Sequence, residues 1–445
     1  MSLRAYPSYR PSNVEWLGDL PDHWEVMRFS RLVDIAEGQV DPRQEPYSSM
    51  VLIAPNHIEA GTGRILGLET AKDQGADSGK YLFSAGDVLY SKIRPSLAKV
   101  VLAPCDGLCS ADMYPLKARA KLSEPFLKWF LLSTGFTAWA TVESDRVAMP
   151  KINREKLSEL PIAAPPRSEQ TAIAAFLDRE TGKIDALVEE QQRLVELLKE
   201  KRQAVISHAV TKGLDPAAPM KASGVEWLGE VPAHWLVAPI RKGAKLESGH
   251  TPSRSRPEWW QDCAIPWFSL ADVWQIREAK RDYVFETKEM VSELGLANSS
   301  ARLLPANTVM LSRTASVGFS AIMGVPMATT QDFANWVCGS RLKPEFLLQV
   351  LRAMSGEFRR LMMGSTHNTI YMPDIQSLTM VLPPLDEQEA IVQHVKLLAG
   401  RYDELTREAE AAIELLHERR AALISAAVTG KIDVRGVLPA QSEAA

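Results

Sequence analysis

The sequence has no long apolar run, no cysteine cluster and no strong excess of charge. No apolar run reaches the ~18 residues needed to span a bilayer, and the start, MSLRAYPSYRPSN, has no apolar signal-peptide core. We therefore expect a cytoplasmic protein without a membrane partner. The four cysteines include no second Cys or His pair at zinc-ligand spacing, so they are interpreted as ordinary thiols. With 51 basic and 55 acidic residues, any nucleic-acid surface must come from the placement of charges.

Motifs for catalysis are missing as well. No Walker A loop occurs. The two Pro-Pro pairs follow Ala163-Ala164 and Val381-Leu382, so neither completes the Asn/Asp-Pro-Pro-aromatic tetrapeptide of amino-methyltransferases. The histidines have no evident nucleophile or metal partner. The sequence therefore favours a non-catalytic chain with no metal site.

What the chain does contain is an internal duplication. SNVEWLGDLPDHW from Ser12 returns as SGVEWLGEVPAHW from Ser223. A longer segment, PPRSEQTAIAAFLDRE from Pro165, aligns without a gap with PPLDEQEAIVQHVKLL from Pro383, 218 residues later. Between these segments the halves are weakly similar, as in LYSKIRP against MLSRTAS. A tandem duplication is indicated, with a variable domain and a repeated segment in each half.

Each repeated long segment is expected to be a helix. Pro-Pro lies upstream, and Gly213 and Gly430 stand where C-cap glycines belong. Apolar residues in a 4-3 rhythm predict a coiled-coil seam between two antiparallel helices. The first copy carries polar interruptions, among them Lys201. The predicted seam residues are Ile173, Leu177, Ile184, Leu187, Leu194, Leu198, Val205, Ile391, Val395, Leu398, Tyr402, Leu405, Leu416 and Leu423.

The fold class that follows is α+β. Two mixed α/β domains, residues 1–166 and 214–384, are joined by helices 167–213 and 385–431, with a tail at 432–445 and a pseudo-two-fold relation between the halves. Within the domains, KVVLAP and AIPWFSL are typical of strands, whereas EPFLKWFLLST and PEFLLQVLRAM are typical of helices. Tryptophans of the repeated phrase are expected to anchor each domain on the helices.

Two neutral domains on a rigid spacer suit the reading of a two-part target. Polar loops with Arg, Asn and Thr can reach base edges and phosphates. The candidate DNA-binding residues are Lys92, Arg94, Lys99, Arg254, Arg256, Arg313, Thr314, Ser316, His367 and Asn368.

Taken together, the paired helices, the EWLG..P.HW phrase before each variable domain and the stretch SGHTPSRSRPEWWQDCAIPWFSLADV resemble the DNA specificity subunit of Type I restriction-modification systems. The resemblance covers nearly the whole chain. It implies that the variable domains are target recognition domains for double-stranded DNA and that the helices dock two modification (methyltransferase) subunits. It also implies restriction subunits in the complex. S-adenosylmethionine, ATP and Mg would be cofactors of those partners, with none in this chain.

The two domains depart from symmetry where VDPRQEPYSS in the first meets HTPSRSRPEWW in the second. Two unlike half-sites are therefore expected. Two other hypotheses remain open at the level of the sequence. One is a coiled-coil adaptor whose heads bind proteins, and the other is a self-sufficient nuclease or methyltransferase.

Overall fold

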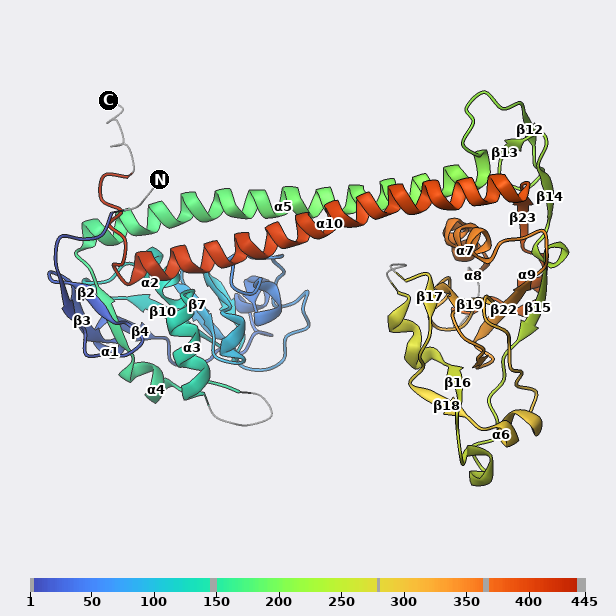
Figure 1. The fold of residues 1–445 in the computed structure, drawn as a ribbon. Helices are drawn as coiled ribbons and strands as arrows, with labels where there is room; N and C mark the ends of the chain where they lie inside the picture. The colour runs from blue at the N-terminus through green and yellow to red at the C-terminus, as the bar shows by residue number, and fades with distance from the viewer. Residues whose placement is uncertain (1–3, 145–149, 278–280, 363–367, 438–445) are drawn as a thin grey trace. The chain divides into compact units, whose positions relative to one another are not determined.

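The computed structural model describes residues 4–144, 150–277, 281–362 and 368–437. The chain forms two compact units, the first made of two separate stretches of sequence and the second of one continuous stretch. The first unit contains residues 1–192 and 410–445, and the second contains 193–409. Each unit therefore holds one variable domain together with part of both long helices, α5 (Arg167–Lys212) and α10 (Leu385–Val428). Figure 1 shows both helices as long continuous rods, as the sequence predicts.

In the first unit, a four-stranded antiparallel sheet has the order β4-β10-β7-β8. A three-stranded sheet, β5-β9-β6, joins a parallel pair to an antiparallel pair. Two-stranded pairs, β1-β2 and β3-β11, connect the domain to the helices. The elements are β1 (Tyr9–Pro11), β2 (Asp19–Pro21), β3 (Glu25–Arg28), α1 (Phe29–Leu32), β4 (Val33–Ile35), β5 (Val51–Ile53), β6 (Tyr81–Phe83), β7 (Val88–Ser91), β8 (Val100–Leu102), β9 (Gly107–Cys109), β10 (Met113–Ala118), α2 (Glu124–Leu131), α3 (Thr134–Glu143), α4 (Arg154–Glu159) and β11 (Pro161–Ala164).

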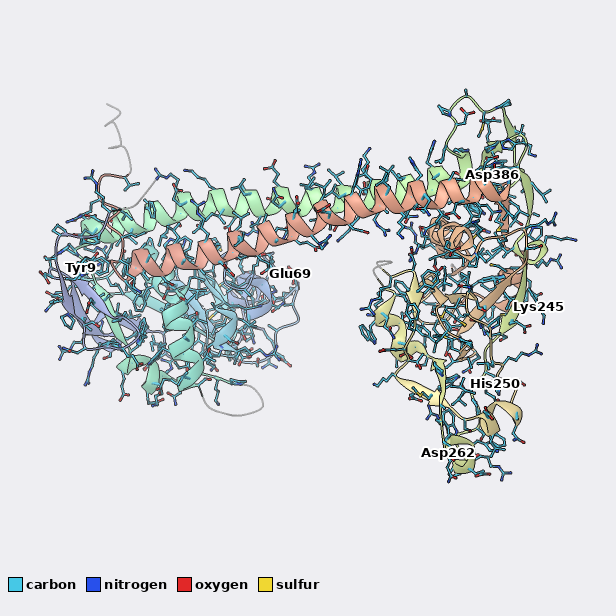
Figure 2. All side chains as sticks on the ribbon, viewed as in Figure 1. Tyr9, Glu69, Lys245, His250, Asp262 and Asp386 are labelled. Atoms are coloured by element: carbon cyan, nitrogen blue, oxygen red, sulfur yellow. The ribbon has the colours of Figure 1, made fainter. Side chains whose placement is uncertain are left out.

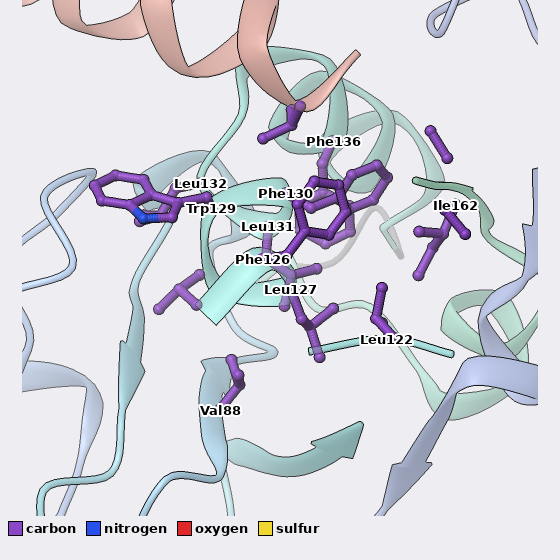
Figure 3. Close-up of a cluster of buried hydrophobic side chains, with 14 of the residues drawn as sticks. Val88, Leu122, Phe126, Leu127, Trp129, Phe130, Leu131, Leu132, Phe136 and Ile162 are labelled. Carbon is purple, nitrogen blue, oxygen red and sulfur yellow. The ribbon is translucent and has the colours of Figure 1, made fainter. Parts of the chain in front are cut away.

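The core of this domain forms around α2, where apolar residues follow one another almost without interruption. Phe126, Phe130 and Phe136 are buried and pack as an aromatic cluster (Figure 3). Burying each such ring contributes about 1.5–3 kcal/mol. The helix ends near Ser133, whose hydroxyl accepts from the Phe136 N–H at 3.3 Å and so begins α3.

The second unit repeats this plan. The order β15-β22-β19-β20 corresponds to β4-β10-β7-β8, and β16 pairs in parallel with β21 as β5 does with β9. It differs in an added edge strand, β17, and in its third small-sheet strand, β18, which lies beside β16. The elements are β12 (Met220–Ala222), β13 (Glu230–Pro232), β14 (Leu236–Pro239), β15 (Ala244–Ser248), β16 (Ile265–Phe268), β17 (Tyr283–Val284), β18 (Glu289–Val291), α6 (Glu293–Ala297), β19 (Val309–Ser312), β20 (Ser320–Met323), β21 (Ala328–Thr329), β22 (Phe333–Cys338), α7 (Pro344–Ala353), α8 (Ser355–Met362), α9 (Met372–Ser377) and β23 (Thr379–Leu382).

Three of the predicted seam residues are exposed in the structure. Leu187, Leu194 and Leu405 are 45%, 42% and 47% exposed, so they lie on the outer helix surface. Their neighbours Val188 and Val195 are buried in their place. Adjacent apolar residues made either choice compatible with a 4-3 rhythm. The other predicted positions are buried or half-buried: Ile173, Leu177, Ile184, Leu198, Val205, Ile391, Val395, Leu398, Tyr402, Leu416 and Leu423.

Two ion pairs cross between the helices at equivalent places. In the first unit, Arg420 Nε donates to Asp185 Oδ1 at 2.8 Å. In the second unit, Arg202 Nε lies 2.9 Å from Asp403 Oδ1. Because Asp403 and Arg420 are the duplicated counterparts of Asp185 and Arg202, the two pairs are the same contact made twice. In the first copy this contact is made by Arg202, one position after Lys201.

Arg420 is further anchored. Its guanidinium also donates to the carbonyls of Gly61 and Thr62 at 2.7 and 2.8 Å, and it lies 5.8 Å from the Trp129 ring centroid. Its side chain is 7% exposed. A buried charge in such a network needs every partner, because the lost hydration is otherwise uncompensated.

In each unit the repeated phrase docks on the first turn of a long helix, α5 in the first unit and α10 in the second. We call each of these two docking sites a corner. In the first corner, Trp24 Nε1 donates to Glu169 Oε2 at 3.0 Å and His23 Nε2 lies 2.7 Å from Glu169 Oε1. The second corner repeats this with Trp235, His234 and Glu387, at 2.8 and 2.7 Å. The tryptophans are buried, as expected for anchors, and also donate hydrogen bonds. The Trp-His pair of the phrase and the Glu of the helix therefore form one joint.

The neighbouring glutamines fasten the domain to the same turn. Gln170 Oε1 accepts from the Ser123 N–H at 2.8 Å, and its amide donates to the Lys121 and Pro165 carbonyls. Gln388 makes the equivalent bonds to Lys343 and to the Arg341 and Pro383 carbonyls. The repeated Glu-Gln pair thus has a purely structural use.

The chain ends close the first unit. The Asp433 N–H donates to the Arg4 carbonyl at 2.7 Å, and Tyr9 Oη donates to the Gly430 carbonyl at 3.0 Å. In the second unit the corresponding stretch, residues 213–220, is continuous chain. Gly430 and Gly213 have φ of 69° and 76°, as predicted for C-cap glycines. A side chain at Gly430 would place Cβ 2.5 Å from Pro21 Cδ.

Candidate nucleic-acid interface

The candidate residues fall on loops that follow β7 and β19, which share one backbone frame. In the β7 loop (residues 92–98), the Lys92 N–H donates to Asp112 and the Lys92 carbonyl accepts from Ile152, both at 2.9 Å. In the β19 loop (residues 313–318), Arg313 makes the same two bonds, with Asp332 and Ile370, also at 2.9 Å. The weak match of LYSKIRP with MLSRTAS is therefore a structural equivalence.

Both loops turn through a left-handed backbone conformation at the same position. Arg94 has φ of 47° and Ala315 has φ of 57°. Such conformations cost about 1–3 kcal/mol in non-glycine residues and persist only when the surroundings hold them. Here the Arg94 N–H donates to the Pro150 carbonyl at 2.8 Å, and the Ala315 N–H donates to the Asn368 carbonyl at 3.1 Å. The loop tips are therefore rigidly presented.

In the first unit the β7 loop carries a cluster of cations around an aromatic ring. Lys92 Nζ lies 5.3 Å and Arg154 Cζ 5.1 Å from the Tyr114 ring centroid. Arg154 also donates to the Ile35 carbonyl at 3.3 Å. Burial raises the pKa of the Tyr114 hydroxyl, and the Arg154 charge lowers it. Tyr114 therefore stays a neutral platform at physiological pH.

Two further cations of this loop cluster point outward. Arg94 and Lys151 are exposed, and Lys151 pairs with Ile93 in an isolated bridge beside the loop. Neither side chain has an ion pair with a residue that the structure describes. Sequence reasoning found Lys92 and Arg94 but missed Lys151, Arg154 and Tyr114. These are far from the loop in sequence, and only the fold brings them to it.

Lys99 has a different position from the other candidates of the first domain. Its Nζ donates to the Pro55 carbonyl at 2.5 Å, and the side chain is half-buried. The bond ties the start of β8 to the segment after β5. Lys99 therefore holds two segments of the domain together.

In the second unit, hydroxyls on the β19 loop and amides on two neighbouring segments lie where the first unit has a cation cluster. Arg313 donates to the Gln331 and Ile370 carbonyls at 3.1 and 3.2 Å, so it braces two loops. Thr251 Oγ1 donates to Gln331 Oε1 at 2.8 Å. Within the loop the Ser316 N–H donates to the Thr314 carbonyl at 2.6 Å. Thr314 pairs with Thr369 in an isolated bridge, and the Asn368 carbonyl accepts from the Ala315 N–H. His367 lies outside the described residues.

Arg254 and Arg256 are placed on a separate segment, after β15. Arg254 lies 4.0 Å from the Trp260 ring centroid and forms an ion pair with Glu289. Arg256 lies 3.8 Å from Glu258. Figure 2 shows His250 and Asp262, which bracket this segment, at the end of the second domain away from Asp386 at the start of α10. Both arginines have a carboxylate partner, unlike Arg94.

Catalytic or metal-binding groupings do not emerge from these loops. The described part of the chain contains no group of three or more His, Cys, Asp or Glu that could hold a metal ion. No helix in the described ranges is long and apolar enough to cross a membrane. Burial raises the pKa of the Cys109 thiol, and burial also raises the pKa of the Cys338 thiol to about 12. Both are therefore protonated thiols, not nucleophilic thiolates, at neutral pH.

Comparison with known proteins gives the family. The model of the Type I restriction modification DNA specificity domain matches residues 21–197 and again 235–415, one match in each half. The EcoDI specificity subunit of Escherichia coli is 34% identical over 54% of this chain and 53% of its own length. A putative type I specificity subunit, MjaX, of Methanocaldococcus jannaschii is 22% identical over 94% of this chain and 96% of its own length.

Solved structures agree on the fold. A chain of a type I R-M system, solved for its complex assembly and conformational transition, has a TM-score of 0.73 at 20% identity, covering 92% of this chain and 98% of that one. The HsdS subunit from Thermoanaerobacter tengcongensis has a TM-score of 0.53 at 19% identity, over 93% and 98%. A duplicated pair of domains joined by two long helices is thus a fold already present in solved structures. The chain belongs to the Type I restriction-modification DNA specificity family.

Proposed function

We propose that this chain reads a bipartite, asymmetric DNA sequence, one half-site with each variable domain, and gives a Type I restriction-modification complex its specificity. One observation carries the proposal. The β7 and β19 loops have the same hydrogen-bonded frame but different side chains, as expected when two copies of one reader have diverged toward different half-sites. Modest non-specific affinity follows from the balanced charge.

The long helices supply a docking surface for partners. In the first unit, Leu187 and Leu415 are 45% and 65% exposed, and they lie on the outer helix surface. In the second unit, Leu197 and Leu405 are 49% and 47% exposed. Leu405 and Leu415 are the duplicated counterparts of Leu187 and Leu197, so the same apolar pattern is displayed twice. Two identical modification subunits are the occupants that such a repeated surface suits, with restriction subunits joining the assembled complex.

Catalysis is assigned to those partners. We expect this chain to be non-catalytic and to bind no cofactor, whereas S-adenosylmethionine serves the modification subunits and ATP and Mg serve the restriction subunits. The complex acts in the cytoplasm. Turnover by the purified chain alone would overturn this division of labour.

The test is to co-express the chain with its neighbouring modification subunit in a methylation-free host and to map methylated adenines across the genome. A single split motif with a fixed gap supports the proposal. A stable complex that leaves no sequence-specific mark would refute DNA reading and favour a protein-binding adaptor.

A further inference from the structure

The two variable domains present different hydrogen-bonding chemistry around their equivalent β7 and β19 loops. The Arg94 position of the first domain corresponds to Ala315 in the second, and Lys92 corresponds to Arg313. What the first domain offers at this place is a set of cations. Among the described residues the second offers amides and hydroxyls, because Arg313 donates to the backbone carbonyls of Gln331 and Ile370.

In the cation cluster of the first domain, the Arg94 guanidinium is available to bind DNA. Arg154 is held by the Ile35 carbonyl and by the faces of Tyr81 and Tyr114, at 5.6 and 5.1 Å. Arg94 is exposed on the left-handed tip, and its side chain makes no hydrogen bond or ion pair with the described residues. A planar fork of donors on a rigid backbone is suited to two acceptors in one plane.

Gln331 has the corresponding role in the second domain. Its side chain is exposed, and its backbone carbonyl is held by Arg313 at 3.1 Å. The Thr251 hydroxyl donates to its Oε1 at 2.8 Å, which fixes the amide so that the NH₂ group faces away from Thr251. Oε1 keeps a second lone pair, so the amide still presents one acceptor and two donors.

These two side chains match different base edges. Guanine presents two acceptors, O6 and N7, in the major groove, which a guanidinium contacts with two donors. Adenine presents an acceptor, N7, beside a donor, N6, which an amide contacts with one group of each kind. Resting on the proposed function, we propose that Arg94 reads a guanine in the first domain's half-site and that Gln331 reads an adenine, other than the methylated one, in the second domain's half-site.

The test uses the purified complex with the modification subunit, after the wild-type motif has been mapped. Every base pair of each half-site is replaced in a set of duplexes, and initial methylation rates are compared. The variants are Arg94→Ala, Arg94→Lys, Gln331→Ala and Gln331→Glu. Matched controls are Arg31→Ala in α1 and Gln376→Ala in α9, which are exposed residues of the same types outside the loops.

The expected result is a local loss of discrimination. Arg94→Ala should reduce the preference at one G·C pair of one half-site by roughly 5- to 150-fold and leave the other half-site unchanged. Arg94→Lys, which keeps a charged donor but loses the planar fork, should reduce the preference at the same pair less. Gln331→Ala should do the same at one A·T pair of the other half-site. Gln331→Glu should move the preference there toward C·G, because a carboxylate accepts from cytosine N4.

Other outcomes overturn the inference without touching the proposed function. If Arg94→Ala slows methylation of all duplexes evenly, with a weaker dependence on salt, and Arg94→Lys restores it, Arg94 contacts phosphate only. If the motif is unchanged in all four variants, neither residue reads a base. If the wild-type complex itself shows no sequence preference, the proposed function has failed first.

Discussion

An equivalent glutamate joins the repeated Trp-His phrase to a long helix in each unit, but its side chain is buried in the first unit and half-exposed in the second. The side chain of Glu169 is 8% exposed, whereas that of Glu387 is 37% exposed. Glu169 also receives a bond from Tyr6 Oη at 3.1 Å and lies 3.5 Å from Arg435. The first corner is where the two chain ends meet, and the second is continuous chain. The added contacts stabilise the corner that has no covalent connection.

The loops differ in the opposite manner. Their backbone bonds are the same in the two units, and their side chains are not. The duplication has therefore kept the contacts that position each domain and each loop, while side chains that do not support the frame have diverged. Substitutions at equivalent positions in the two units test how far this holds.

The largest effect is expected in the helix seam. Leu177→Asp in the first unit and its counterpart Val395→Asp in the second should each cost about 4 kcal/mol or more, because an unpaired carboxylate would be buried. Leu405→Asp, on the exposed surface, should change the free energy of unfolding by less than about 0.5 kcal/mol. Urea unfolding measures both. Leu405→Asp should instead lower the number of modification subunits that co-purify from two to one, because the first unit's surface is unchanged. Two retained subunits would exclude the second unit's surface from docking.

The ion pairs should respond unequally. Arg420→Ala leaves Asp185 and two carbonyls without their donor, and we expect a loss of about 3–5 kcal/mol. Arg202→Ala should cost less, because Asp403 is 29% exposed and can be hydrated. Hydrogen exchange of the two units, measured separately, shows where protection is lost. Equal losses would mean that the carbonyl contacts of Arg420 contribute nothing.

The corners should differ in the same direction. Glu169→Gln is expected to cost about 1.5–3 kcal/mol, the range for hydrogen bonds to a buried charged group. For the half-exposed Glu387, Glu387→Gln should cost about 1 kcal/mol. Thermal unfolding of the two variants against the parent decides this. A larger effect at Glu387 would contradict the contrast between the corners.

The smallest effect concerns acid. A hydrogen bond from Arg435 lowers the pKa of Asp433 in the closure of the first unit. A carboxyl group with a depressed folded-state pKa stabilises the protein above its unfolded pKa of about 3.9, and that contribution is lost as the pH falls through the folded-state value. Asp433→Asn should thus lower stability at pH 7 slightly and flatten its fall in acid. An unchanged pH profile would show that the closure does not depend on this charge.

Much of the architecture could be predicted from the sequence, because the signals for each long helix are local and occur in both halves of the chain. Pro-Pro before each helix, glycine after it and the heptad rhythm determine α5 and α10. The register was less certain, since Leu187 and Val188 are both apolar and only packing decides between them. The Arg420–Asp185 pair could not be predicted, because charged residues are frequent on both helices and the pairing partner lies 235 residues away.

The interface shows the same limit. Lys92 and Arg94 were found from a local basic stretch, whereas Arg154 and Tyr114 join them only through the fold. Arg254 and Arg256 were chosen from an equally basic stretch, yet each has a carboxylate beside it. Local composition identifies cations but does not say which of them are already paired.

The most direct test of the central claim exchanges one domain for the other. The Phe29 N–H donates to the Leu160 carbonyl at 2.7 Å, and the Ile240 N–H donates to the Leu378 carbonyl at 2.9 Å, so residues 29–160 can replace 240–378 at equivalent junctions. Methylated adenines are then mapped for this chain in complex with the modification subunit. The account predicts the first domain's half-site on both sides of the gap, with the second copy inverted. An unchanged asymmetric motif would contradict it.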